Sequence, residues 1–309
     1  MSFLKKKFEK GVIRNMPSAR MRFKKLLRCV VSFIAYYSGL SPIWYFLFAR
    51  HAVRILTYHG IELTPTNSYA VSVANFEKHM QHLSKYFNVI SLDQYQKGIK
   101  QKISFPPNTV IITVDDGFKN FYEQAYPILK KYCLPSTCFV ITSKVLSDND
   151  DFMHWKELSE ILADGLVTVG SHSVSHRSLS VLNEFELQRE VGESKKILEN
   201  NLGMPINFFS YPCGTLRDFN ENSTKAILKF HYKLACTSVN GINRNNKNPY
   251  KLRRTKLEWG DNLSIFTRIL RGSLDIWIVV DYCFRFLQKK EEVDFKTKKT
   301  LWENKHINR

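Results

Sequence analysis

The sequence lacks the features that mark several common classes of protein. Its six cysteines form no Cys-x-x-Cys pair and no paired spacing, which argues against a disulfide framework. It contains no internal repeat, no low-complexity tract, and neither a helix-turn-helix signature nor an aromatic-interleaved RNA-binding motif. We therefore expect one large domain with appendages, reduced and mostly buried thiols in a cytosol-facing protein, and no nucleic-acid partner.

Acidic residues are nearly absent from the first 50 positions. Residues 1–28 carry ten Lys or Arg against the single Glu9, a local charge of +9 out of a total of +18. Residues 29–49 then contain no charged side chain at all. A basic segment beside an apolar one is typical of a protein that binds an anionic membrane surface.

A long uninterrupted hydrophobic run is also missing. Gly39 and Pro42 break the apolar segment 29–49, and three serines dilute it. We therefore expect a broken helix in the inner-leaflet interface, which would make the protein peripheral or monotopic on the cytoplasmic face of the membrane. The alternative is one N-terminal transmembrane helix, because the segment is long enough to cross a bilayer. No cleavable signal peptide is expected, since the basic region is too long and no small-x-small site follows it.

Two adjacent carboxylates follow the most strand-like run of the sequence. Residues 109–114 are mostly β-branched, as in a strand buried on both faces, and Asp115, Asp116 and Gly117 come directly after them. Active sites of α/β folds lie at the carboxyl ends of strands. Because adjacent carboxylates repel each other, this pair indicates either a solvated turn or a cation between the two groups.

Two histidines follow a second strand-like run. His172 and His176 come after residues 167–171, and one helical turn would place both imidazoles on the same side. Two imidazoles and one carboxylate form a common zinc-binding set. The alternative is a pair of hydrogen-bonded loop histidines, but the combination with Asp115 and Asp116 favours a metal.

These motifs resemble those of the polysaccharide deacetylase family, which is carbohydrate esterase family 4 with its NodB-homology domain. The Thr-Phe-Asp-Asp-Gly motif of the family reads Thr113-Val114-Asp115-Asp116-Gly117 in this chain. Its His-Ser/Thr-x-x-His motif reads His172-Ser173-Val174-Ser175-His176, and a later strand end reads Phe209-Ser210-Tyr211-Pro212-Cys213-Gly214. The resemblance covers residues 54–257. It implies a metal-dependent hydrolase that removes N-acetyl groups from an amino sugar in a polysaccharide, an oligosaccharide or a lipid-linked glycan.

The resemblance also implies roles for individual residues. Asp116, His172 and His176 are the expected ligands of one divalent metal ion, and Asp115 is the expected base that takes a proton from water. Zinc is favoured, although the same donors accept cobalt, nickel or iron. A membrane-associated glycan-binding protein with a degenerate, inactive metal site is the alternative function.

The third motif is expected to bind the substrate and its oxyanion. The main chain around Tyr211, Pro212 and Gly214 would complete the oxyanion site. Many members of the family carry an Arg in this motif that orients the base, and this chain has none there. We expect Arg253 or Arg254 to replace it, with plain surface charge as the alternative for at least one of them.

His59 is the predicted general acid. The usual proton donor of the family, a histidine in a Leu-x-His motif near the end of the domain, is not found after Gly214. Members that act on poly-N-acetylglucosamine instead resemble this chain in having a Tyr-His pair after the first barrel strand, where Tyr58 and His59 stand. An unperturbed imidazole pKa near 6.5 would suit protonation of an amine. A structural histidine at a strand end is the alternative.

Alternating strand and helix signals predict an α/β fold, a distorted (β/α) barrel. The expected division is a membrane-associating arm (1–50), the deacetylase barrel (51–262), and an amphipathic helix with a charged tail (263–309). Residues 263–287 either pack on the barrel or form a second interfacial anchor. Further strands are expected at 54–58, 89–91, 136–142, 206–211, 233–238 and 253–257, and further helices at 73–86, 92–99, 118–132, 154–163, 184–202 and 222–232.

Overall fold

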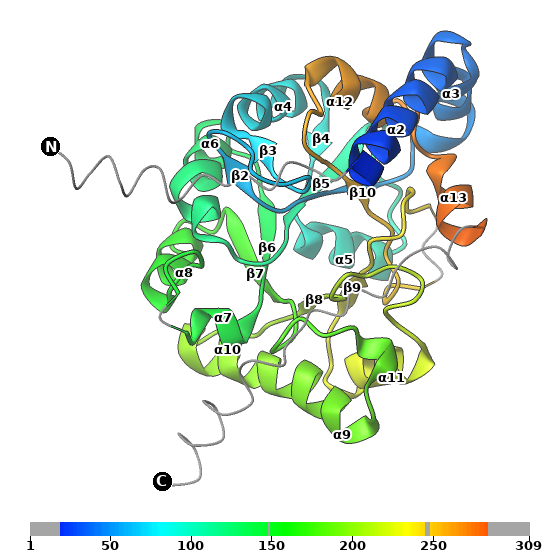
Figure 1. Ribbon diagram of the computed structural model, residues 1–309. Coiled ribbons are helices and arrows are strands. Elements are labelled where there is room, and N and C mark those ends of the chain that lie inside the picture. Colours follow the sequence, from blue (N-terminus) through cyan, green and yellow to red (C-terminus); the bar gives the residue numbers. More distant parts are fainter. Residues whose placement is uncertain (1–18, 148, 245–247, 284–309) are drawn as a thin grey trace, which may run out of the picture.

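The computed structural model describes residues 19–147, 149–244 and 248–283, and the statements below concern these residues (Figure 1). Most of the basic N-terminal segment and the charged tail, both singled out in the sequence, lie outside the described residues.

A parallel eight-stranded sheet forms the centre of the described fold (Figure 1). Its order is β10-β1-β5-β6-β7-β8-β9, and β4 pairs with β5. The sheet curls until β9 meets the chain just before β10 through a bridge between Cys236 and Leu252. This confirms the predicted (β/α) barrel. The strands are β1 (Arg54–Tyr58), β4 (Asn88–Val89), β5 (Thr109–Val114), β6 (Ser136–Val140), β7 (Val167–Ser171), β8 (Phe208–Ser210), β9 (Leu234–Cys236) and β10 (Thr255–Lys256).

The barrel interior is apolar at one end and polar at the other. Side chains of a strand alternate between the interior and the helices, so Ile111, Thr113 and Asp115 follow one another up the inner face of β5 and beyond its end. The lower layer is a buried cluster that α5 (Leu92–Lys100) closes with Leu92 and Tyr95. The polar groups can therefore meet solvent only at the carboxyl ends of the strands.

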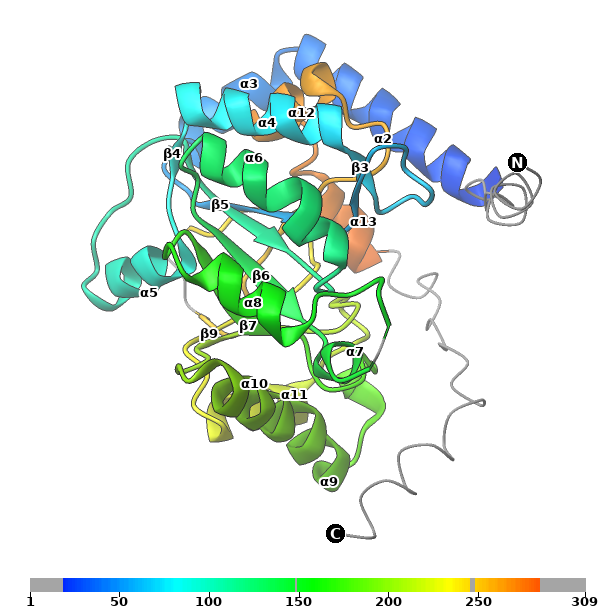
Figure 2. The same cartoon turned by 90° about the vertical axis from the view of Figure 1, so that its left-hand side faces the viewer.

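Helices surround the sheet on the outside, as Figure 2 shows. In that view α2 (Ala19–Tyr37), α4 and α12 form one side, and α9, α10 and α11 lie at the other. A small sheet of β2 (Ile61–Glu62) and β3 (Val71–Ser72) follows β1. The outer helices are α4 (Val73–Tyr86), η2 (Phe121–Ala125), α6 (Tyr126–Lys131), α7 (Thr142–Val145), α8 (Trp155–Leu162), η3 (Leu179–Val181), α9 (Glu184–Leu187), η4 (Gln188–Glu193), α10 (Ser194–Leu202), α11 (Glu221–Lys229), α12 (Leu263–Leu270) and α13 (Trp277–Cys283).

Helix caps explain several boundaries. The Ser72 hydroxyl accepts a hydrogen bond from the Asn75 N–H at 3.3 Å, which begins α4 where the sequence predicts it. Asn183 caps the continuous helical run α9–η4–α10, and Gly203 ends that run in the left-handed conformation with φ 66°. The single amphipathic helix expected over 263–287 is wrong. The described part breaks into α12 and α13 around Gly272, whose φ of 85° ends the first helix.

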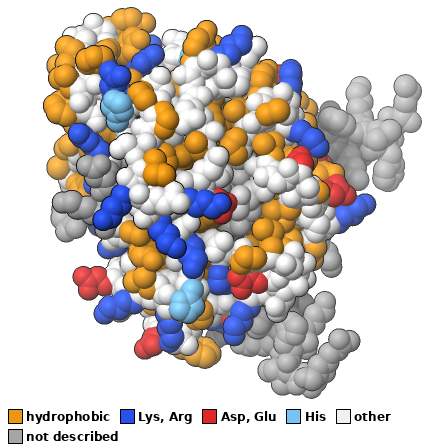
Figure 3. Space-filling model, turned by 180° about the vertical axis from the view of Figure 1, so that it is seen from behind, with side chains coloured by type: hydrophobic (Ala, Val, Ile, Leu, Met, Phe, Trp, Pro, Cys, Tyr) orange, Lys and Arg blue, Asp and Glu red, His pale blue; other side chains and the backbone are white. Residues whose placement is uncertain are grey.

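The N-terminal arm is a broken helix, as predicted. Helix α2 (Ala19–Tyr37) ends before Gly39, which has φ 81°, and α3 (Leu40–Trp44) and η1 (Tyr45–Ala49) follow. In the described residues no single helix is long and apolar enough to span a membrane. The two segments Lys25–Tyr37 and Leu40–Ala49 together have the length and apolar composition of a membrane span, but they are bent by 71°. The corner that holds α3, at the upper left in Figure 3, gathers apolar side chains with Lys and Arg among them.

Candidate active site

A buried ion pair lies at the top of the barrel interior. The Arg254 guanidinium donates to both carboxylate oxygens of Asp115, at 2.8 Å to Oδ1 and 2.7 Å to Oδ2. It also donates to the Ser210 hydroxyl at 2.9 Å and, through Nε, to the Thr237 carbonyl at 2.8 Å. Arg254 is 1% exposed and Asp115 is 2% exposed. This fork holds the carboxylate in one orientation.

The ion pair also fixes the charge of Asp115. Burial alone would raise the pKa of this carboxyl, but the charge of Arg254, the neighbouring His172 and the hydrogen bonds from Arg254 together outweigh burial and bring the pKa below its ordinary value. Asp115 is therefore ionised in the resting site. Of the two arginines that the sequence offered as partners of Asp115, Arg254 is the one that contacts it. Arg253 points elsewhere, toward Gly241 and a separate surface hollow.

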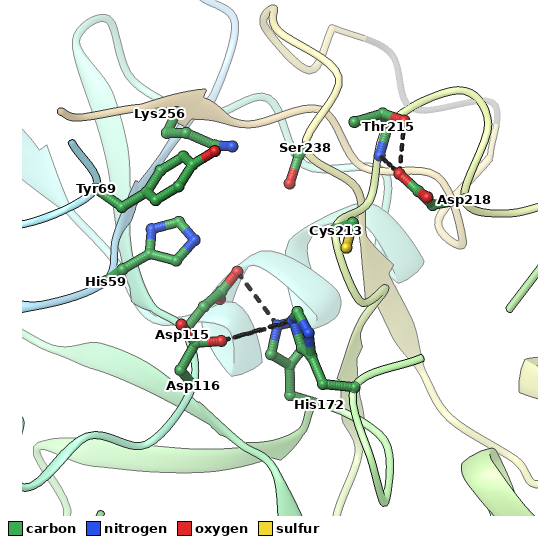
Figure 4. Close-up of a pocket in the computed structure, with 11 residues that line it drawn as sticks. His59, Tyr69, Asp115, Asp116, His172, Cys213, Thr215, Asp218, Ser238 and Lys256 are labelled. Carbon is green, nitrogen blue, oxygen red and sulfur yellow. Dashed lines mark hydrogen bonds and ion pairs between the residues drawn. The ribbon is translucent and has the colours of Figure 1, made fainter. Parts of the chain in front are cut away.

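Asp116, His172 and His176 bring their donor atoms together beside Asp115, and Figure 4 shows Asp116 facing His172 across the pocket floor. Asp116 Oδ1 lies 3.5 Å from His172 Nε2 and 3.6 Å from His176 Nε2. The two Nε2 atoms are 3.1 Å apart. One donor atom from each residue lies within 4.8 Å of the others, a spacing that can hold a single cation.

The chemistry of these donors fits a divalent metal. His172 Nδ1 lies 2.7 Å from the Ser210 carbonyl oxygen, which can only accept, so the Nδ1–H donates and the Nε2 lone pair faces the cluster. Burial lowers the pKa of His172 to about 3 and also lowers the pKa of His176, so both imidazoles are neutral. Burial and then repulsion by Asp115 raise the pKa of Asp116 to about 7. A cation would relieve that repulsion.

The histidine motif is a tight loop, so the helical turn predicted for it is wrong. Ser173 and His176 have φ values of 65° and 62°, which an α-helix does not allow. The loop nevertheless directs both imidazoles to the same point. The Glu190 carboxylate holds it by accepting hydrogen bonds from the N–H groups of Val174 and Ser175, at 3.0 and 2.8 Å.

Glu190 is a functional residue that sequence reasoning missed. It is 3% exposed and lies in η4 between the buried Leu187 and Val191. A charged residue on the apolar face of a helix was the signal that could have revealed it. Its role is to shape the loop that carries His176.

A pocket of about 250 Å³ opens above the donor cluster. Figure 4 shows His59 between Asp115 and the ring of Tyr69, with Lys256 beyond that ring. The His59 and Tyr69 rings are 5.7 Å apart, and the Lys256 ammonium lies 5.2 Å from the Tyr69 centroid. His59 therefore lies in the pocket where the sequence predicts it.

The environment of His59 differs from the expected one. Burial lowers the pKa of His59 to about 3, against the opposing effect of Asp115. Its Nδ1 is buried, and no hydrogen-bond partner for it occurs in the described parts of the chain. The resting imidazole is therefore neutral, whereas the sequence-based expectation is an unperturbed pKa near 6.5.

The third motif reaches the pocket through Cys213. The Tyr211 N–H donates to the Cys236 carbonyl at 3.0 Å, so it continues the sheet and does not face the pocket. Pro212 has no N–H, and the Gly214 N–H donates to the Pro212 carbonyl. Cys213, with φ 57°, lines the pocket. Gly214 allows this turn to approach the segment that follows β9, because a Cβ there would lie 2.7 Å from the Ser238 nitrogen.

Solved deacetylase structures share this fold. The Streptococcus pyogenes deacetylase PplD in complex with acetate is 22% identical, with a TM-score of 0.65 over 71% of this chain and 98% of its own. IcaB from Ammonifex degensii is also 22% identical, with a TM-score of 0.64 over 72% of this chain and 97% of its own. These likenesses place the chain among the deacetylase (β/α) barrels.

Sequence comparison finds deacetylases among the relatives of the chain. The chain is 29% identical over 213 residues to YxkH of Bacillus subtilis, provisionally named a polysaccharide deacetylase, and this match covers 69% of the chain and 74% of the relative. It is 32% identical over 183 residues to the poly-β-1,6-N-acetyl-D-glucosamine N-deacetylase of Staphylococcus aureus strain MRSA252, covering 54% of the chain and 62% of that enzyme. The profile of the polysaccharide deacetylase family matches residues 102–235, and both of these relatives are deacetylases by name.

Proposed function

We propose that the chain is a metal-dependent N-deacetylase that hydrolyses acetamido groups of an N-acetylated glycan. One observation carries the proposal: a cluster of three metal donors lies directly beside a buried carboxylate that a guanidinium keeps ionised. The naming of relatives as polysaccharide and poly-N-acetylglucosamine deacetylases supports the same reaction class.

Amide hydrolysis needs an activated water and stabilisation of the oxygen that becomes negative. A divalent metal held by Asp116, His172 and His176 would supply a Lewis acid and a water of lowered pKa. His172 keeps its Nε2 lone pair available because its Nδ1–H is bound to Ser210 O. Glu190 positions the loop of His176 through Val174 and Ser175.

Asp115 is the proposed base that takes the proton of the attacking water. Its His172-facing oxygen, Oδ2, lies 3.9 Å from His172 Nε2, so water bound at the cluster is within its reach. The guanidinium of Arg254 makes Asp115 a weak base, because it stabilises the ionised carboxylate. A weak base gives its proton up readily, so Asp115 can pass the proton on when the amine leaves.

His59 remains the proposed proton donor, with a more restricted role. Because its pKa is lowered to about 3, it is neutral before the reaction and can donate only a proton that it receives during the reaction. The buried Nδ1 without a described partner favours a hydrogen bond to the substrate. The turn at Cys213 is the proposed oxyanion contact of the third motif, since it lines the pocket and Tyr211 does not.

The glycan would lie against Tyr69. This ring borders the pocket and is 37% exposed, so it offers an apolar platform for the face of a sugar. Lys256 extends over the same ring and can donate hydrogen bonds to sugar hydroxyls.

The test measures amine release from a β-1,6-linked N-acetylglucosamine oligomer by full-length protein, before and after chelation and after addition of zinc, cobalt, nickel or iron. We expect release to stop on chelation and to return with a metal. His172→Ala should lose both the metal and the activity, whereas Arg177→Ala, on the exposed side of the same loop, should retain both. Activity that survives complete metal removal would contradict the proposed chemistry. Stoichiometric metal without amine release from any N-acetylated glycan would favour the glycan-binding alternative.

A further inference from the structure

The outward side of the arm exposes a series of large apolar side chains in the described structure. Its exposed side chains follow helical spacing along α2 and continue through α3 and η1. Thirteen of the twenty-five large apolar side chains that are exposed in the described chain belong to this arm face. The arm face consists of Phe23, Leu26, Leu27, Val30, Phe33, Ile34, Tyr37, Leu40, Ile43, Trp44, Phe46, Leu47 and Phe48.

The opposite side of the arm is fixed to the barrel. Arg28 is 6% exposed and donates to Glu258 at 3.0 Å and to Asp261 at 3.2 Å. The hydroxyls of Ser32 and Ser273 are hydrogen-bonded at 2.7 Å. The arm face therefore cannot turn inward without breaking buried polar contacts, which is costly.

The described part of the arm carries charge of one sign only. Residues 19–50 contain no Asp or Glu. Arg268 lies over the Phe33 ring at 5.8 Å, and Arg50 lies over the Phe46 ring at 5.0 Å. Figure 3 shows Lys and Arg side chains among the apolar ones at the corner that holds α3.

We propose that the arm face docks on an anionic lipid bilayer and lies in its interface. Apolar side chains bordered by cations fit the acyl boundary and the acidic headgroups of such a bilayer. A second copy of the chain fits poorly, because pairing two arm faces would bring two cationic borders together. A membrane span also fits poorly, since the two helices are bent by 71° and their inner side, with Arg28 and Ser32, is hydrogen-bonded to the barrel.

The docked arm would also brace the pocket. Arg28 donates to the main-chain carbonyl of Lys256 at 2.6 Å, and the Lys256 side chain lines the pocket. Helix α2 would thus fix the distance and the orientation of the pocket relative to the bilayer. This observation makes point substitutions preferable to deletion of the arm, because deletion would leave the buried Asp261 without Arg28 and Lys25.

The experiment compares full-length variants in flotation with vesicles of phosphatidylcholine and phosphatidylglycerol. The test variant combines Leu26→Glu, Ile34→Glu and Leu47→Glu, which are 61%, 59% and 59% exposed. Its matched control places three Glu residues on the distant side of the molecule, in η3, α9 and α11 (Figure 1). The control positions are Val181, Phe185 and Leu228, which are 52%, 77% and 46% exposed.

We expect the test variant to lose vesicle partitioning by at least about 100-fold and the control to match the wild type. The difference should persist at about 1 M salt, where a Debye length near 3 Å screens the attraction of the basic N-terminal residues. Equal partitioning of test variant and wild type would overturn the proposal. A wild-type dimer that the test variant converts to monomers, with vesicle binding unchanged, would assign the arm face to a second copy and also overturn it.

A second measurement does not depend on the folding of the triple variant. Trp44 is 44% exposed on the arm face, so bromine-labelled lipids should quench its fluorescence in the wild-type protein. The conservative substitution Trp44→Phe should remove most of that quenching. Absence of quenching in the wild type would place the arm face away from lipid and refute the docking.

Discussion

The buried pair of Arg254 and Asp115 permits a quantitative test of the site. Arg254→Met retains an unbranched apolar chain but removes the guanidinium, and with it the hydrogen bonds of 2.8 and 2.7 Å to the carboxylate. Asp115 would remain buried, at 2% exposure, without its cation. Arg253→Met is the matched control, because Arg253 is the preceding residue and its side chain points toward Gly241.

The expected loss of stability is large. Removing one partner of a buried ion pair costs about 3–5 kcal/mol, which lowers the folding equilibrium constant roughly 150- to 5000-fold. Both groups are almost fully buried, so solvent screening removes little of this effect. Arg253→Met should cost less than about 1 kcal/mol.

The dependence on pH has a defined sign. In the wild type the folded pKa of Asp115 lies below the unfolded value near 3.9, so its stabilisation is present above that value and is lost as the pH falls through the folded pKa. In Arg254→Met, burial should raise the pKa of Asp115 above the unfolded value, so the carboxyl destabilises the fold increasingly as the pH rises through that pKa. The gap between wild type and variant should therefore widen from acidic to neutral pH.

Urea unfolding of the metal-free protein between about pH 4 and pH 8 measures this gap. The double variant Asp115→Asn, Arg254→Met should be more stable than Arg254→Met at neutral pH, because a neutral amide needs no cation. Equal stabilities of Arg254→Met and Arg253→Met at neutral pH would refute the reasoning. A stability difference between wild type and Arg254→Met that does not change with pH would also refute the reasoning.

Three further predictions address single groups. Asp115→Asn should keep the metal and lower turnover by about 100-fold or more, and near-normal turnover would assign the base elsewhere. His59→Ala should also keep the metal and lose most of the turnover, whereas wild-type rates would exclude His59 as the proton donor. Burial lowers the pKa of His79 to about 4, so its contribution to stability is present above the unfolded pKa near 6.5 and is lost, up to about 3 kcal/mol, as the pH falls toward 4. His79→Gln should flatten the stability profile in that window, and an unchanged slope would show that other groups produce it.

The strand that carries Asp115 was predictable because its signals are local. Alternation along β5 places Asp115 on the inner face above Thr113, and the glycine after Asp116 permits the turn. The choice between Arg253 and Arg254 was not predictable, since β10 covers only Thr255–Lys256 and so short a strand has no readable alternation. In the structure Arg254 points into the barrel interior, as Leu252 does two residues earlier.

The arm shows a different limit of sequence reasoning. Gly39 and Pro42 in its apolar run predicted a broken helix, and the structure confirms this. Its attachment to the barrel depends on Arg28 and Asp261, which are 233 residues apart in the sequence, and no local pattern connects them. The contact between the arm and the barrel therefore could not be predicted from the sequence.

The raised pKa of Asp116 gives the donor cluster a property of its own, a competition between protons and metal. Burial already keeps His172 and His176 deprotonated near neutral pH, so Asp116 is the donor at which a proton competes. Below about pH 7 a metal ion must displace that proton, and affinity should fall by about tenfold for each further pH unit. Mild acid would thus release the metal while Asp115 is still ionised. On the proposed function, an acidic buffer should lower activity through loss of metal, and a return to neutral pH with fresh metal should restore it.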